Sequence, residues 1–150
     1  NVERFSFLTV VDLTADSDGI IFETGAAAWG TVLYQHDGVL YLQAGRGNGT
    51  GATANRGEAS WTIVEGRATI EGSLDANGGL ALIVNGEAVS QSSFSAPRLG
   101  GGNAGSISGT NSGVAANRGG FTRNDAGHPG VAQVAIFEGQ TTGHEIAAPD

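Results

Sequence analysis

Two carboxylates stand one residue apart, at Asp16 and Asp18, in the segment Ala15–Gly19, whose composition is that of a turn. Carboxylates in a loop can supply oxygen ligands to calcium, which takes about six to eight of them. The next acidic residue along the chain is Glu23. The same spacing suits an Asx-type turn, in which the side chains bond to their own backbone. Two interpretations therefore stay open: a calcium loop at Asp16 and Asp18, or a structural turn. Calcium is the one cofactor that the sequence suggests.

A short internal repeat places an amide beside a guanidinium twice. The segment 51–57 recurs as 113–119, and both copies end in Asn-Arg-Gly. Such a pair offers many donors to sugar hydroxyls or to a carboxylate, while an indole can stack on a sugar ring. The alternative is that Asn-Arg-Gly shapes two loops whose arginines pair with surface acids. The expected ligand contacts are Trp29, Asn55, Arg56, Asn117 and Arg118.

The remaining aromatic residues have strand-like neighbours. Trp61 alternates with Ala59 and Ile63, which predicts a core position. Tyr34 and Tyr41 lie in two β-rich runs, and we expect them to be neighbours in a sheet rather than ligand contacts.

Catalytic groups are sparse in this sequence. The three histidines, His36, His128 and His144, lie far apart, each near a turn glycine or proline, so we expect solvated loop positions rather than a zinc site. Glycoside hydrolysis needs two carboxyl groups about 5–9 Å apart. The nearest candidates, Glu65, Glu71 and Asp75, have the wrong spacing along the chain. We therefore expect no enzyme.

Composition limits the partners of the chain. It has 150 residues, enough for one domain spanning 1–150 with a real core, and a formal net charge of −8. All 7 basic residues are arginine and form no cluster, so nucleic acid and anionic membranes should be repelled. No apolar run is long enough to insert into a membrane. Cys is absent, which excludes disulfides and thiolate chemistry. Since the chain lacks Met and begins with Asn1, we expect a piece of a longer product.

Alternation with a period of two dominates the chain and predicts an all-β fold. Runs around 5–13, 19–25, 31–35, 39–43, 59–64, 68–74, 80–84, 87–89 and 131–137 read as strands, with Gly66 ending the fifth. Asp37-Gly38 and Asn85-Gly86 predict tight hairpins. The Gly-rich stretch 99–130 shows no clear element. Many short strands with regular turn signals indicate an antiparallel two-sheet β-sandwich, or jelly roll.

The order of these segments resembles the concanavalin A-like lectin and glucanase superfamily, in particular its laminin-G-like domains. The resemblance rests on Asp18–Gly25, Leu33-Tyr34 with Asp37–Leu40, Leu80–Gly86, Leu99–Asn103 and Gly130–Phe137. Calcium-type members tend to carry an Asp near the strand that begins at Gly30, where this chain has Ala26-Ala27-Ala28-Trp29. The resemblance implies a jelly roll and a function in binding glycans or proteins, some members using calcium.

Two hypotheses follow. The first is a non-catalytic recognition or adhesion module, lectin-like and glycan-binding, that acts outside cells or on a virion surface. The alternative is a structural subunit that decorates a capsid or builds a surface filament. Its motivation is the shortage of chemical groups and the apolar first strand, which could pair with a neighbouring chain. The expected partners are thus a glycan or a protein surface, with self-association or docking on a larger assembly in the second case.

Overall fold

A computed structural model describes residues 4–25, 30–45, 56–75, 79–93, 105–107 and 127–138. These residues form ten β-strands and no helix. The strands are β1 (Arg4–Leu13), β2 (Gly19–Gly25), β3 (Gly30–His36), β4 (Val39–Gly45), β5 (Arg56–Thr62), β6 (Gly66–Asp75), β7 (Gly79–Val84), β8 (Glu87–Ser93), β9 (Gly105–Ile107) and β10 (Val131–Glu138). Accordingly, none of the described residues belongs to a helix that could cross a membrane.

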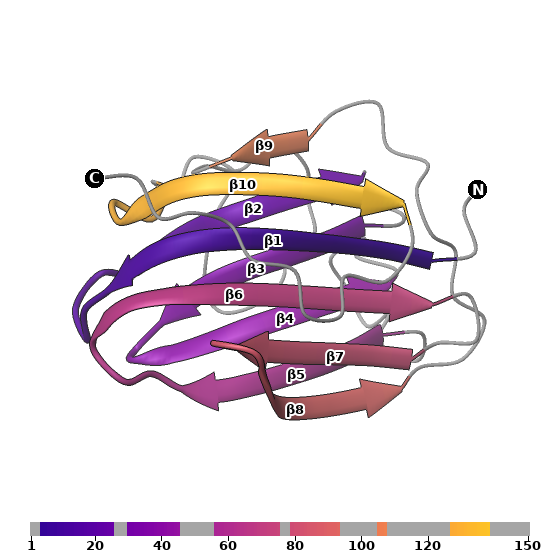
Figure 1. Ribbon diagram of the computed structural model, residues 1–150, viewed down its shortest axis with the longest axis horizontal. Coiled ribbons are helices and arrows are strands. Elements are labelled where there is room, and N and C mark those ends of the chain that lie inside the picture. Colours follow the sequence, from indigo (N-terminus) through magenta and orange to yellow (C-terminus); the bar gives the residue numbers. More distant parts are fainter. Residues whose placement is uncertain are drawn as a thin grey trace.

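The strands form two antiparallel sheets that stack face to face (Figure 1). One sheet has the order β10-β1-β6-β7-β8 and the other has the order β5-β4-β3-β2-β9. Figure 1 shows the strands of the two layers crossing at a moderate angle, as in aligned β-sandwiches. The predicted all-β, two-sheet sandwich is confirmed.

Two tight turns set the register of the hairpins. Asp37 and Asn85 have φ angles of 48° and 51°, and the glycines that follow them, Gly38 and Gly86, have φ angles of 74° and 82°. Both central residues of a type I′ turn need positive φ, which Asp-Gly and Asn-Gly tolerate best. These turns connect β3 to β4 and β7 to β8, as the sequence predicted.

The core lies between the sheets and is built from alternate residues of both. Phe7 of β1 and Phe22 of β2 meet across it, with ring centroids 5.0 Å apart. Leu42 and Leu82 belong to the same buried cluster, on opposite sheets. Since each buried Leu or Phe side chain contributes about 1.5–3 kcal/mol, this shared interior holds the two layers together.

Tyr34 and Tyr41 lie on the outer face of the second sheet. They are register partners on β3 and β4, and their rings stack with centroids 5.0 Å apart. Tyr34 packs with Ile20 and Val32 in a separate small cluster. The prediction that the two tyrosines are sheet neighbours is confirmed.

Strand β1 occupies an interior position in its sheet. It pairs with β10 along one edge and with β6 along the other. Residues from both of its faces, Phe7 and Val11 as well as Leu8 and Val10, are buried. Its backbone edges are therefore used within the chain, which removes the free apolar strand that motivated the structural-subunit hypothesis.

Two details of the strand boundaries and faces differ from the sequence prediction. Gly66 begins β6, whereas the preceding strand already ends at Thr62. Simple alternation along β10 would put Val131 and Val134 on opposite faces of the sheet, but both pack against the main core. A register shift between Val10 and Val11 of β1 lies opposite this part of β10. Such a bulge adds one residue to the strand and reverses the alternation beyond it.

Candidate functional site

Four connections gather at one end of the sandwich, which we call the turn rim. They are residues 14–18 between β1 and β2, 37–38 between β3 and β4, 63–65 between β5 and β6, and 85–86 between β7 and β8. The backbone N–H of Ala15 donates to Glu65 Oε1 at 2.9 Å, and the N–H of Ile63 donates to the Gly38 carbonyl at 3.0 Å. These bonds cross between connections, so they hold the rim as one surface.

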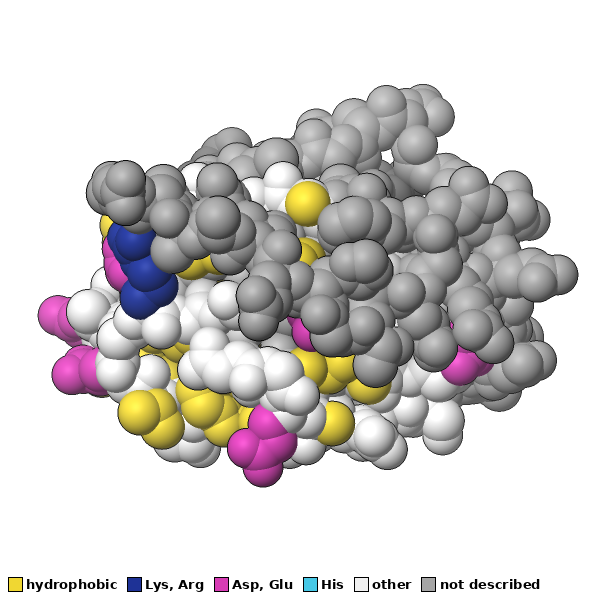
Figure 2. All heavy atoms as spheres, in the orientation of Figure 1, with side chains coloured by type: hydrophobic (Ala, Val, Ile, Leu, Met, Phe, Trp, Pro, Cys, Tyr) yellow, Lys and Arg dark blue, Asp and Glu magenta, His cyan; other side chains and the backbone are white. Residues whose placement is uncertain are grey.

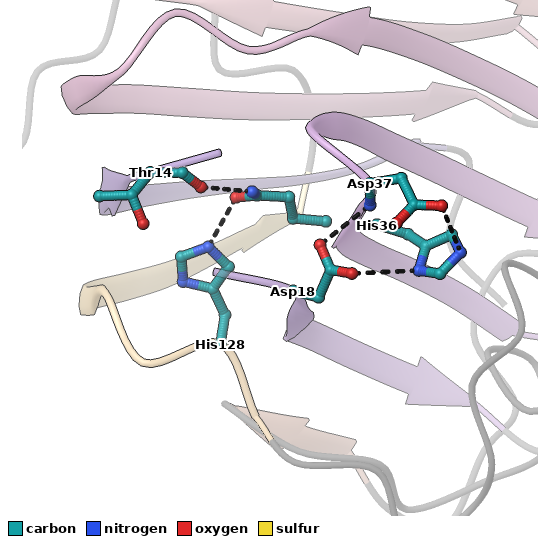
Figure 3. A network of polar contacts seen from close by, with 6 residues as sticks. Thr14, Asp18, His36, Asp37 and His128 are labelled. Atoms are coloured by element: carbon teal, nitrogen blue, oxygen red, sulfur yellow. Dashed lines mark hydrogen bonds and ion pairs between the residues drawn. The ribbon is translucent and has the colours of Figure 1, made fainter. Parts of the chain in front are cut away.

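Asp18, His36 and Asp37 form a polar cluster at this rim (Figure 3). Asp18 Oδ1 accepts a hydrogen bond from the Asp37 N–H at 2.9 Å. Asp18 Oδ2 lies 3.3 Å from His36 Nδ1, and Asp37 Oδ2 lies 3.4 Å from His36 Nε2. Each residue offers one ligand atom, and these atoms lie within 4.8 Å of one another. One imidazole and two carboxylates are a set that could hold a divalent cation.

Asp16 does not join this cluster. Its Oδ1 accepts a hydrogen bond from the Thr14 hydroxyl at 3.1 Å, inside the same turn. Asp16 thus makes the local contact that the turn interpretation predicts. Asp18 instead contacts His36 and Asp37, where β3 turns into β4. Calcium prefers an all-oxygen shell, and the cluster supplies two carboxylates and a nitrogen ligand. The described side chains alone therefore fit calcium poorly, and the calcium site at Asp16 and Asp18 stays a prediction.

His128 is buried beside the rim, with an exposed fraction of 1%. Its Nδ1 accepts from the Gly130 N–H at 3.0 Å, which leaves the proton on Nε2 to donate to Gln35 Oε1 at 2.8 Å. Gln35 Nε2 in turn donates to the Thr14 carbonyl at 2.6 Å. Figure 3 shows this chain of contacts reaching from His128 to Thr14. Burial lowers the pKa of His128 below its ordinary 6.5, and the charge of Asp18 opposes that shift.

The expectation that His128 is a solvated loop residue is wrong. Its N–H donates to the Ile20 carbonyl at 2.8 Å, so the segment before β10 lies against the start of β2. A Cβ on Gly130 would come within 2.0 Å of the Asp12 carbonyl oxygen, so only glycine allows this close approach. The glycines on both sides of His128-Pro129 were the signal in the sequence that this segment packs closely against another strand.

The other two histidines differ from His128. His36 is half-buried at the end of β3, and His144 lies outside the described residues.

A groove of about 410 Å³ opens at the turn rim between the two sheets. Its apolar lining includes Trp61, Val64, Val84 and Val89, and its polar lining includes Glu65, Arg67, Asn85 and Glu87. We call these eight residues the rim groove. Val64 is 69% exposed, and Trp61 is half-buried, packed against the core on one side. Figure 2 shows hydrophobic side chains at this end of the molecule, with acidic side chains at their margin. Trp61 thus lies at the boundary of the core, where the sequence predicted a core position.

Arg67 is held in place by Asp12 of β1. Its Nε donates to Asp12 Oδ1 at 2.8 Å and its Nη2 donates to Asp12 Oδ2 at 3.0 Å. This two-point contact lowers the pKa of Asp12 and raises the pKa of Arg67, mainly through the hydrogen bonds. The guanidinium is therefore already directed at a carboxylate of its own chain.

The described lining of the rim groove includes none of the five ligand residues expected from the sequence. Arg56 begins β5 opposite Gly45, at the end of the second sheet away from Asp37, and nothing further is described of its side chain. Trp29, Asn55, Asn117 and Arg118 lie outside the described residues. These assignments stay predictions. The rim groove itself was missed, because it joins residues from β5 to β8 that show no common motif.

Comparisons with known proteins identify the fold. No protein-family model and no curated protein matches the chain. Domains LG4-5 of the mouse laminin alpha1 chain superpose with a TM-score of 0.69 at 13% identity, covering 99% of this chain and 39% of that one. The LG1-3 region of the laminin alpha2 chain gives 0.62 at 10% identity, covering 91% and 28%. A botulinum neurotoxin type C structure gives 0.55 at 10% identity, covering 93% and 33%.

The chain thus spans about two fifths or less of the length of these solved structures. At this level of identity the likeness defines architecture, and function must be argued from the site. The match agrees with the laminin-G-like resemblance in the sequence. The chain has a laminin-G-like β-sandwich fold.

Proposed function

We propose that this chain is a non-catalytic recognition module that binds a glycan in the rim groove, as part of a secreted, cell-surface or virion protein. The observation that carries the proposal is the half-buried indole of Trp61 in a groove that also holds carboxylates and an amide. A volume of about 410 Å³ is within the range of small-molecule sites, about 300–1,000 Å³.

The lining suits a sugar because sugars are amphipathic. The C–H face of a pyranose ring can stack on the Trp61 indole, since an aromatic face carries partial negative charge. Hydroxyl groups at the ring edge donate to carboxylates such as Glu65 and Glu87, which also line the groove. The Asn85 Oδ1 is used by the Thr69 N–H at 2.9 Å, so its NH₂ is the part of this amide suited to donate to a ligand.

The solved structures with this fold support the choice of ligand. Cell entry of botulinum neurotoxin type C is dependent upon interaction with two ganglioside molecules. A ganglioside carries a sialylated glycan on a lipid, so that toxin gives a precedent for a glycan as ligand, whereas the charge of the glycan accepted here must be argued from the groove of this chain. The superposition covers 93% of the present chain and 33% of the toxin chain.

We also infer that Glu71 and Asp75 do not form a glycosidase pair. Glu71 and Asp75 lie on the same strand, four positions apart, which separates their backbone positions by about 13 Å. Retaining and inverting glycosidases need carboxyl groups about 5–9.5 Å apart. Asp75 also accepts a hydrogen bond from the Gly79 N–H at 3.1 Å in its own turn.

The test is a glycan array probed with the wild-type chain and with Trp61→Phe, Trp61→Ala and Glu87→Ala. We expect binding by the wild type, weaker binding by Trp61→Phe, and loss of binding by Trp61→Ala. Gln91→Ala, an exposed substitution on β8 outside the groove, should bind as the wild type does. A wild-type chain that binds no glycan would overturn the proposal, and so would full binding by Trp61→Ala.

Calcium at Asp16 and Asp18 remains a separate proposal. Calorimetric titration of calcium into chelator-treated protein should show binding that both Asp16→Asn and Asp18→Asn weaken. Asp75→Asn is the matched control, because Asp75 ends β6 at the opposite end from the turn rim. Equal binding by all three variants would place any calcium elsewhere.

A further inference from the structure

The charge of the rim groove restricts which glycans it can accept. Two carboxylates, Glu65 and Glu87, line it, and Arg67 is the one cation among its described lining residues. Arg67 already makes the two-point contact with Asp12 described above. The net charge of the groove lining is therefore negative even though an arginine is present.

Acidic residues around the groove add to this negative charge. Asp16, Asp18 and Asp37 belong to the same turn rim, and Asp16 and Asp37 are exposed. The chain as a whole carries a formal net charge of −8. An anionic group near this end of the molecule thus meets repulsion from the groove, from its rim and from the protein as a whole.

We propose that the rim groove selects neutral glycans, made of hexose or N-acetylhexosamine units, and excludes glycans that carry a carboxylate or a sulfate. This inference rests on the proposed glycan-binding function and names the ligand class for the same groove. A neutral sugar can donate hydroxyl protons to Glu65 and Glu87 without adding charge. A sialylated, uronic or sulfated sugar would place an anion beside those carboxylates, where the one guanidinium of the described lining is already engaged by Asp12.

The acetamido group of an N-acetylhexosamine also matches the lining. Its methyl group can lie against Val64, whose side chain is 69% exposed at the rim. Burying that apolar surface is favourable at about 25 cal/mol per Å². The lining thus offers apolar contacts and hydrogen-bond acceptors to an uncharged ligand.

The test compares N-acetyllactosamine with its 3′-sialylated form by calorimetry or ligand-observed NMR at low salt. We expect the neutral sugar to bind and the sialylated one to bind at least about tenfold more weakly, since like charges across an interface oppose association. The double variant Glu65→Gln, Glu87→Gln should restore most of the sialylated sugar's affinity and change that of the neutral sugar less. The amide oxygen introduced by Glu65→Gln can still accept from the Ala15 N–H, so the rim should stay folded.

Asp75→Asn serves as the matched control, because it removes one negative charge at the opposite end of the sandwich. It should leave the ratio of the two affinities unchanged. Equal affinities for the two sugars in the wild type, or a preference for the sialylated one, would overturn the inference and leave the glycan-binding proposal standing. Absence of binding to any glycan would overturn both.

Discussion

His128 joins two parts of the chain that are far apart in sequence. Its ring nitrogens contact Gly130 and Gln35, and its backbone N–H contacts Ile20. Because Nδ1 accepts from a backbone N–H, only the neutral ring satisfies both contacts. Protonation at Nδ1 would place a second donor against the Gly130 N–H, and burial makes the charged form costly.

This arrangement predicts a loss of stability on mild acidification. In the unfolded chain the imidazole takes up a proton near its ordinary pKa of 6.5, whereas buried His128 takes it up at lower pH. Between the two pKa values the unfolded state binds more protons, so the free energy of unfolding falls as pH is lowered through that window. Above pH 6.5 the imidazole is neutral in both the folded and the unfolded state, so its protonation no longer lowers the free energy of unfolding. Urea denaturation across this range measures the change.

His128→Gln provides the comparison, since it removes the titrating ring. Carboxylates contribute to acid sensitivity in both proteins, so the difference between the two curves isolates His128. We expect a shallower fall in the variant. Parallel curves for the variant and the wild type would contradict the assignment.

At the level of elements, the sequence predicts the hairpins best, because each hairpin joins two strands that are consecutive in the chain. The Asp37-Gly38 and Asn85-Gly86 turns and the strands beside them follow from local residue preferences. The Asp18 cluster required knowledge of register, because Gly19 pairs with Gln35 and only this pairing brings Asp18 beside His36.

Other features depend on long-range structure that no local pattern encodes. The bulge in β10, where Val131 and Gln133 pair with consecutive residues of β1, places Val131 on the core face against simple alternation. The rim groove needs β5 and β8 to approach each other across the two sheets. That approach is seen in the hydrogen bond at 3.2 Å from the Ser60 N–H to the Ser90 hydroxyl. A sequence predicts which elements form better than it predicts where two sheets meet.

The β7–β8 turn depends on Asn85 in two ways. Its φ of 51° disfavours residues with a plain Cβ, and its Oδ1 accepts from the Thr69 N–H of β6 at 2.9 Å. We expect Asn85→Ala to lower the free energy of unfolding by about 2–3 kcal/mol, from backbone strain and the lost hydrogen bond. Chemical denaturation measures this value. The exposed Gln91→Ala should change it by less than about 0.5 kcal/mol, and similar values for both would refute the role of the turn.

For the whole molecule, the interior shared by the two sheets is the main source of stability. Phe22 of β2 is 1% exposed and faces Phe7 of the opposite sheet. Phe22→Ala should therefore cost about 3–5 kcal/mol, through lost burial and the cavity left behind. Thermal or urea unfolding measures the loss.

Val64→Ala tests the same principle at the surface. Val64 is 69% exposed, so its truncation should change stability by no more than about 0.5 kcal/mol. A large effect would mean that the rim groove is part of the core rather than an open surface. The pair of variants thus separates the interior that holds the sheets together from the groove proposed to bind ligand.

The pairing of β1 with β10 decides how the molecule would respond to mechanical load. Phe5 near the start of β1 lies opposite Glu138 at the end of β10, and the two strands are antiparallel. Tension applied at these two positions would open the inter-strand hydrogen bonds one after another, like a zipper, instead of shearing them all at once. The fold should therefore yield to low forces when pulled at these points.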